Sequence, residues 1–282
     1  MAIITTNDNR RYQTADVTRT NSGMIIGGAA TAACTTVATT SLRKFIGNKT
    51  SQISQSCNLN TLYGAVGAAF TQSGLADKGV KIINITTPKN SNYTPPFNLK
   101  LKFSKKILKR IEELKKGKNA CFVPETKKIL INMEKIGVAA FHEIGHAMNY
   151  NFSKFWGCMQ KVRIQMPKVA GGIMLAALLT RKKVDGEKPQ NSFDKAATFV
   201  KNNVGKLVLL TFVPTIAEEL KASHNGNKMA AEVLGSDMLK KIKTSNKLGA
   251  LSYISGAILT AGAAVAGSKI RDEITKPKEI TD

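Results

Sequence analysis

The sequence predicts a mainly α-helical protein with a small β-sheet (α+β), in which some helices can enter a membrane. Two uncharged stretches, residues 20–42 and 248–268, are long enough to cross a bilayer as helices, which takes about 20 residues. Residues 134–150 repeat apolar side chains at helical spacing. Only residues 80–86 and 120–133 have the character of strands.

Each end of the chain contains an apolar helix that is rich in small residues. Residues 1–42 combine a polar beginning with an Ala- and Thr-rich apolar helix, and residues 247–282 combine an Ala- and Gly-rich helix with a basic tail. The polar beginning does not match the short basic start of a secretory signal peptide, so export by that route is not expected. Each apolar helix has few Leu or Phe residues, which leaves two interpretations, a membrane span or a helix buried in protein.

Residues 43–246 form the expected main domain. Residues 62–76 are Ala- and Gly-rich and predict a helix, and residues 103–116 predict a helix with a basic outer face. A strand is expected over residues 80–86, and a β-hairpin over residues 120–133. The hairpin leads directly into the helix predicted after it.

Two shorter apolar runs follow, at residues 169–180 and 207–217, with the charged stretch 181–206 between them. Neither run spans a membrane alone. If flanking lysines extend toward the headgroups, the two runs form an apolar helical hairpin over about residues 164–217 that dips into or crosses the membrane. As helices of a soluble core they need no such extension.

The chain is strongly basic, with 42 Lys and Arg against 19 Asp and Glu and a formal charge of +23. This balance predicts a polyanionic partner, and an anionic membrane surface is the partner we expect. Nucleic acid is unlikely on this sequence, because only 6% of residues are aromatic and none interleave with basic residues as base-stacking surfaces require. The four cysteines form no CxxC, so neither a thiolate metal site nor a disulfide framework is indicated.

An HExxH motif, formed by His142, Glu143 and His146, predicts metal-dependent chemistry. Residues four apart lie one turn apart on the same face of a helix, so the two imidazoles can bind one tetrahedral Zn²⁺. Glu143 lies beside them and can act as the general base that takes a proton from water. The alternative is a pair of hydrogen-bonded histidines on a buried helix.

A catalytic zinc site needs a third protein ligand. Asn149 and Phe152 occupy the positions of the Gly and His in HExxHxxGxxH, which excludes that ligand pattern. Downstream, residues 219–223 read ELKAS and match an ExxA[SD] element, in which Glu219 is the expected third ligand. Glu218 and His224 are the alternatives.

HEIGHA, two apolar segments and a later ExxAS element together resemble the membrane-associated gluzincins. These include the HtpX-type heat-shock proteases, the prenyl-protein endopeptidases and the bacterial neutral zinc metallopeptidases. The resemblance covers about residues 129–234 and implies a zinc-dependent endopeptidase with the ligands and base named above. Ser223 stands where many relatives have an Asp that orients a ligating histidine, which implies a less basic ligand here.

The expected substrate is a protein or peptide near a membrane. Basic residues are more numerous in residues 99–163 than in residues 181–203, which predicts a membrane-associated protein with its catalytic side in the cytoplasm. A noncatalytic membrane-associated protein that keeps a metallopeptidase fold is the second hypothesis, and a basic nucleic-acid-binding protein is the third. The sequence does not fix an oligomeric state.

Overall fold

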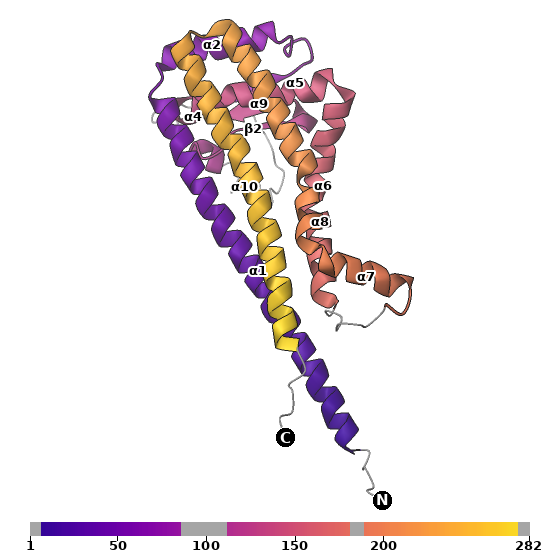
Figure 1. The fold of residues 1–282 in the computed structure, drawn as a ribbon. Helices are drawn as coiled ribbons and strands as arrows, with labels where there is room; N and C mark the ends of the chain where they lie inside the picture. The colour runs from indigo at the N-terminus through magenta and orange to yellow at the C-terminus, as the bar shows by residue number, and fades with distance from the viewer. Residues whose placement is uncertain (1–6, 86–111, 181–188, 276–282) are drawn as a thin grey trace, which may run out of the picture. The chain divides into compact units, whose positions relative to one another are not determined.

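The computed structural model describes residues 7–85, 112–180 and 189–275, with the backbone alone for residues 7–20. The described chain is predominantly helical and has one small sheet, so the predicted fold class is confirmed (Figure 1). The helices are α1 (Asn7–Gln55), α2 (Leu59–Gln72), α4 (Met133–Ile136), α5 (Ala140–Phe152), α6 (Lys154–Leu179), α7 (Ser192–Asn202), α8 (Val204–Thr211), α9 (Val213–Val233) and α10 (Ser236–Thr275). The strands are β1 (Lys81–Asn84), β2 (Cys121–Val123) and β3 (Lys128–Ile131).

The chain divides into two compact units. Unit 1 consists of Met1–Ser41, Arg163–Val213 and Ser255–Asp282, and unit 2 consists of Leu42–Val162 and Pro214–Ile254. Each unit is therefore assembled from segments that are distant in the sequence. The HExxH motif and the ExxAS element both belong to unit 2.

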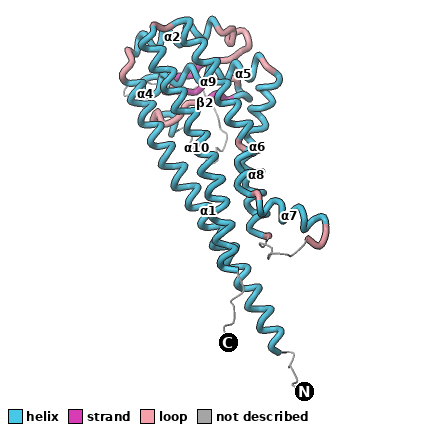
Figure 2. The backbone as a smooth tube through the Cα atoms, viewed as in Figure 1, coloured by secondary structure: helices cyan, strands magenta, loops and turns pink. Residues whose placement is uncertain are grey.

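The sheet of unit 2 has the order β1-β3-β2 (Figure 2, magenta). β1 pairs with β3 in parallel, with Ile82 opposite Ile129, and β2 pairs with β3 in antiparallel fashion, with Phe122 opposite the same residue. The predicted hairpin is confirmed, and its turn is a 3₁₀ segment, Pro124–Thr126, followed by Lys127 at φ 52°. Helix α5 packs against β2, β3 and α2, so the helix carrying the motif lies on the sheet.

Residues 134–150 were predicted as one helix, and this prediction is wrong in detail. Asn132 caps α4 by accepting a hydrogen bond from the Lys135 amide, and the chain then passes through a 3₁₀ segment, Gly137–Ala139, before α5 begins. A Cβ at Gly137 would lie 2.6 Å from Leu62 Cδ2 of α2. The chain therefore packs closely against α2 at the break between α4 and α5.

In unit 1, α8 and parts of α6 and α10 pack around small apolar residues. The buried set is Ala170, Ala177, Val204, Val208, Ala261 and Ala264. Next to it, the ammonium group of Lys201 lies 2.8 Å from Asp272 and donates to the carbonyl of Ala177 at 3.1 Å. The Lys201–Asp272 ion pair thus joins α7 to α10, and the hydrogen bond from Lys201 joins α7 to α6.

Three helices in the described part of the chain are long and apolar enough to cross a membrane. They are Asn21–Gln55 within α1, Lys154–Leu179 and Ser236–Thr275. Many large apolar side chains are exposed on them, including Ile25, Val37, Leu175, Leu179 and Ile258. These features are consistent with membrane association.

The apolar segments at residues 169–180 and 207–217 differ from their prediction. The first belongs to the 26-residue helix α6, which is long enough to span alone. The second is divided between α8 and α9 at Phe212, and Pro214 lies in the first turn of α9, where a missing amide proton costs no hydrogen bond. Most of the helix predicted over residues 103–116 lies outside the described residues.

Candidate metal centre

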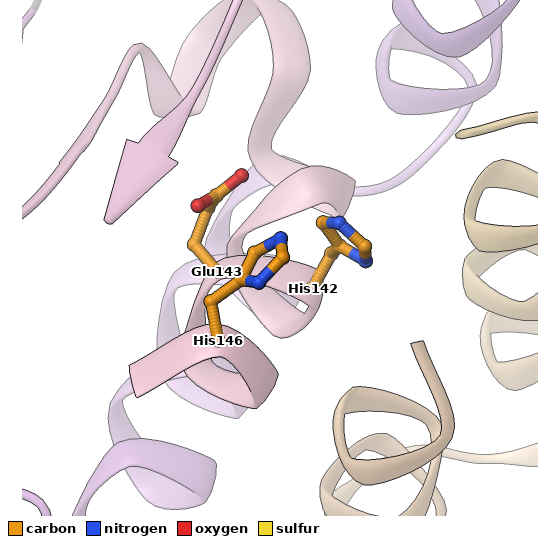
Figure 3. Close-up of side chains that lie close together, drawn as sticks. All are labelled: His142, Glu143 and His146. Atoms are coloured by element: carbon orange, nitrogen blue, oxygen red, sulfur yellow. The ribbon is translucent and has the colours of Figure 1, made fainter. Parts of the chain in front are cut away.

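Helix α5 brings the three motif side chains together, as the periodicity of HExxH predicts. His142 and His146 lie one turn apart with their ring centroids separated by 4.5 Å, and the rings meet edge to face. Figure 3 shows both imidazoles projecting from the same helix, with Glu143 beside them. Ligand atoms of these three residues lie within 4.8 Å of one another.

The carboxylate of Glu219, from α9, faces both imidazoles. Its Oε2 lies 3.0 Å from Nε2 of His142 and 3.4 Å from Nε2 of His146. Two ligand atoms bound at 2.0–2.1 Å to one tetrahedral ion are separated by about 3.3 Å. Both measured separations, from Oε2 to each Nε2 atom, are close to this value, so the Glu219 carboxylate and each imidazole are spaced as two ligands of one ion would be.

The other two predicted candidates for the third ligand differ from Glu219 and from each other, since Glu218 forms a possible metal-binding group with His146 and Glu219, whereas His224 does not. Glu218 is fully buried, but its Oε1 contacts Nδ1 of His146 at 2.8 Å, on the side of the ring away from Glu219. His224 is exposed and belongs to neither of the possible metal-binding groups found among the described residues. Only Glu219, of the three, places a carboxylate oxygen near both Nε2 atoms.

Ser223 contacts the second nitrogen of His142, with its Oγ 3.2 Å from Nδ1. If Nε2 of each ring coordinates an ion, the proton of each neutral ring resides on Nδ1. His142 then donates to the hydroxyl of Ser223, and His146 donates to the carboxylate of Glu218. Each imidazole therefore has an acceptor that favours the metal-binding tautomer.

Glu143 is almost buried and points toward the sheet. Its Oε2 accepts a hydrogen bond of 2.6 Å from the backbone amide of Phe122 in β2. Strand β2 thereby holds the Glu143 carboxylate in place.

The electrostatics of the site favour a protonated His146 beside an ionised Glu219. Burial acts to lower the pKa of His146, but the carboxylates of Glu219 and Glu218 outweigh burial and raise this pKa to about 10. Burial acts to raise the pKa of Glu219, but His146 and His142 hold it well below its ordinary value. A carboxylate charge buried beside two imidazoles also favours a cation placed between them.

Two glycines allow α5 and α9 to approach closely enough for these contacts. A Cβ at Gly145 would overlap the backbone carbonyl of Ala222, and a Cβ at Gly226 would overlap the carbonyl of Phe141. The glycine inside HEIGH is therefore needed for packing, and Gly226 has the same role on the facing helix. The sequence patterns that predict the ligands contain no signal for this pairing.

Two overlapping groups in the described part of the chain could hold a metal ion, one of His142, Glu143 and His146 and the other of His146, Glu218 and Glu219, and they share His146. Together they contain both motif imidazoles and the Glu219 carboxylate that faces them. The residues fit a cation both in their separations and in their charge. Comparison with known proteins adds no assignment, since no family model, curated protein or solved structure matches the chain.

Proposed function

We propose that this protein is a zinc-dependent endopeptidase that acts at a membrane. The proposal depends above all on one observation, that Glu219 Oε2 lies within 3.4 Å of the Nε2 atoms of both HExxH histidines. Two histidines and a carboxylate are the three protein ligands of one class of catalytic zinc site, with the fourth position left to water or substrate.

The chain's own residues supply the remaining chemistry. Zinc in such a site polarises a carbonyl group and makes water more acidic. Glu143 accepts a proton from the water that adds to the carbonyl carbon, and transfers a proton to the amine nitrogen as the C–N bond breaks. The hydrogen bond from the Phe122 amide holds this carboxylate in place, next to the two histidines.

The position of strand β2 in the sheet favours a peptide as the substrate. Among the described strands β2 is at the edge of the sheet, because it pairs with β3 alone. An extended peptide can add to such an edge through backbone hydrogen bonds. Since the Phe122 amide on this strand reaches Glu143, a peptide alongside β2 lies near the proposed base.

The membrane part of the proposal is supported by the three long apolar helices and by the net charge of +23. Basic residues near a span favour the cytoplasmic side and bind anionic headgroups. We therefore place the catalytic unit at the cytoplasmic face, with protein substrates that lie close to the membrane.

The test is zinc content and peptidase activity of the purified full-length protein in detergent. We expect one zinc per chain and hydrolysis of an unfolded protein substrate. Glu143→Gln should keep zinc and lose activity by at least about a hundredfold, as removal of a general base does. Glu134→Gln, at an exposed position of α4 outside the site, is the matched control and should keep both.

The outcomes also separate the other hypotheses. Stoichiometric zinc without hydrolysis of any protein substrate would favour a noncatalytic protein. Absence of zinc, together with nucleic-acid binding that weakens steeply with salt and is insensitive to chelators, would favour the nucleic-acid hypothesis.

A further inference from the structure

Glu218 precedes the proposed ligand Glu219 and is fully buried within unit 2. Its Oε1 lies 2.8 Å from Nδ1 of His146 and accepts hydrogen bonds from Asn149 Nδ2 at 3.1 Å and Gln160 Nε2 at 2.7 Å. The donors come from α5 and α6, whereas Glu218 is on α9. One carboxylate oxygen of α9 thus collects contacts from two other helices.

These contacts identify a site built for a negative charge. A buried carboxylate is costly unless charged or polar donors surround it. Here both amides are themselves held in place, since Gln160 also donates to the backbone carbonyl of His146 at 2.7 Å and Asn149 accepts from Asn225 at 2.9 Å. A side chain needed only to fill space at position 218 would not require this arrangement.

The two histidines differ in the group behind them. His142 has the neutral hydroxyl of Ser223 at 3.2 Å, whereas His146 has a carboxylate. A carboxylate that accepts the Nδ1 proton fixes the ring orientation, keeps the proton off Nε2 and makes Nε2 a stronger donor to a metal. Only His146 receives this support.

We propose that Glu218 is a positioning residue that holds His146 as an Nε2 ligand and supplies the negative charge that Ser223 lacks. This inference rests on the proposed zinc site. Glu218 acts through His146 and does not contact the ion. The carboxylate of Glu218, the residue before the proposed ligand Glu219, thus supports His146, the second histidine of the motif.

The test compares Glu218→Gln with Glu218→Asp in the full-length protein. Gln has nearly the same shape but no charge, and its amide can donate to Nδ1 and so favour the wrong tautomer. We expect Glu218→Gln to weaken zinc binding, measured by competition with a chromophoric chelator, by about 10- to 100-fold. Glu218→Asp keeps the charge and should recover most of that loss.

Two further measurements separate positioning from a general structural effect. Glu232→Gln, the same change at an exposed position of α9, should leave the zinc affinity unchanged. The visible absorption spectrum of the Co²⁺-substituted protein should change in Glu218→Gln and remain like the wild type in Glu218→Asp. The unfolding temperature in the presence of chelator shows whether each variant is folded.

Each outcome decides the inference. If Glu218→Gln binds zinc as tightly as the wild type, or if both folded variants weaken binding equally, Glu218 is not a positioning residue. If Glu218→Gln does not fold, Glu218→Asp alone decides, because near-normal affinity and spectrum support the inference and a loss as large as 100-fold overturns it. Wild-type protein that binds no zinc overturns the proposed function and this inference together, whereas unchanged affinity in the Gln variant overturns the inference alone.

Discussion

Gly145 of α5 lies directly against the backbone carbonyl of Ala222 in α9, with no room for a side chain between them. Ala222 precedes Ser223, which contacts His142, and follows Glu219 by less than one helical turn. The spacing of the two helices at this point therefore determines how far the Glu219 carboxylate lies from the imidazoles.

Gly145→Ala is expected to disrupt the site by separating the helices. The added methyl group overlaps the carbonyl of Ala222, so α9 must shift and the protein should lose about 1–3 kcal/mol of unfolding free energy together with zinc affinity. Gly64→Ala in α2 is the matched control, since nothing lies within 4 Å of its Cβ. At position 64 the same change should raise the unfolding free energy of the protein by about 0.5–1 kcal/mol, because Gly is a poor helix former. Chemical denaturation and zinc titration of both variants measure these effects, and equal stabilisation of the two would contradict the packing argument.

Replacing Glu219 with Ala should remove zinc binding more completely than replacing Glu218. Glu219 Oε2 faces both Nε2 atoms, so its loss deletes a proposed ligand, whereas Glu218 Oε1 meets His146 at Nδ1, the nitrogen not proposed to bind zinc. The zinc content after gel filtration should fall close to zero in Glu219→Ala. His224→Ala should keep full zinc content, because His224 is exposed. Retention of zinc by the Glu219 variant would show that another residue is the third ligand.

Metal removal should lower the unfolding temperature of the wild type. A ligand that binds only the folded protein, at a concentration about 1,000-fold above its Kd, contributes about 4 kcal/mol. Chelator should therefore shift the thermal transition of the wild type downward, and it should leave Glu219→Ala nearly unchanged. Intrinsic fluorescence during heating provides the measurement. A chelator effect of equal size in both proteins would place the bound metal at another site.

The stability of the chelator-treated protein should fall as the pH rises between 6.5 and about 10. The pKa of His146 is raised from 6.5 to about 10 in the folded protein by the carboxylates of Glu219 and Glu218, so the folded state binds more protons than the unfolded state in this window. The contribution of His146 to the unfolding free energy is complete below pH 6.5 and is lost as the pH rises through the pKa of His146 in the folded protein. His146→Gln should show a smaller slope when unfolding is followed by denaturant titration across this range. A wild-type stability that rises with pH in the same window would contradict the sign of this shift.

Leu175→Arg should weaken membrane association. Leu175 is 57% exposed on α6, one of the three helices long enough to span, and an Arg within a span is unfavourable, by about 2.5–3.5 kcal/mol at the centre and by less toward the ends. Leu59→Arg, at a less exposed position at the start of α2, is the control. The fraction of each protein retained in membranes after alkaline washing gives the comparison. Equal retention of both variants and the wild type would argue that α6 does not face lipid.

Local patterns in the sequence predict the parts of the site that depend on short spacing. HExxH places His142 and His146 on one face of α5, because this relation is set by the period of a single helix. The ExxAS element names Glu219 as a candidate, but its approach to His142 joins residues 77 positions apart and depends on how α9 packs on α5. The support from Gln160 is not predictable in this way, since it joins residues 58 positions apart and follows from how α6 packs. The pairing of Gly145 with Ala222 likewise depends on tertiary contact.

The same division applies to the fold. The strand and hairpin of unit 2 follow from alternation and turn residues, and the structure contains them. The length of α6 does not follow from such a pattern. Lys161 and Lys168 interrupt the apolar residues, and Pro167 usually marks a helix boundary. In the structure α6 runs through all three positions, with both lysines exposed.

The order of segments along the chain has a consequence for biogenesis. His142 and Glu219 are 77 positions apart, and the intervening chain includes the whole of Arg163–Val213, which belongs to unit 1. A nascent chain that has emerged from the ribosome only as far as Thr211 therefore carries both imidazoles but no third ligand. The proposed ligand set can be complete only after this apolar segment has been synthesised, so chains arrested before that point are expected to lack the proposed zinc site.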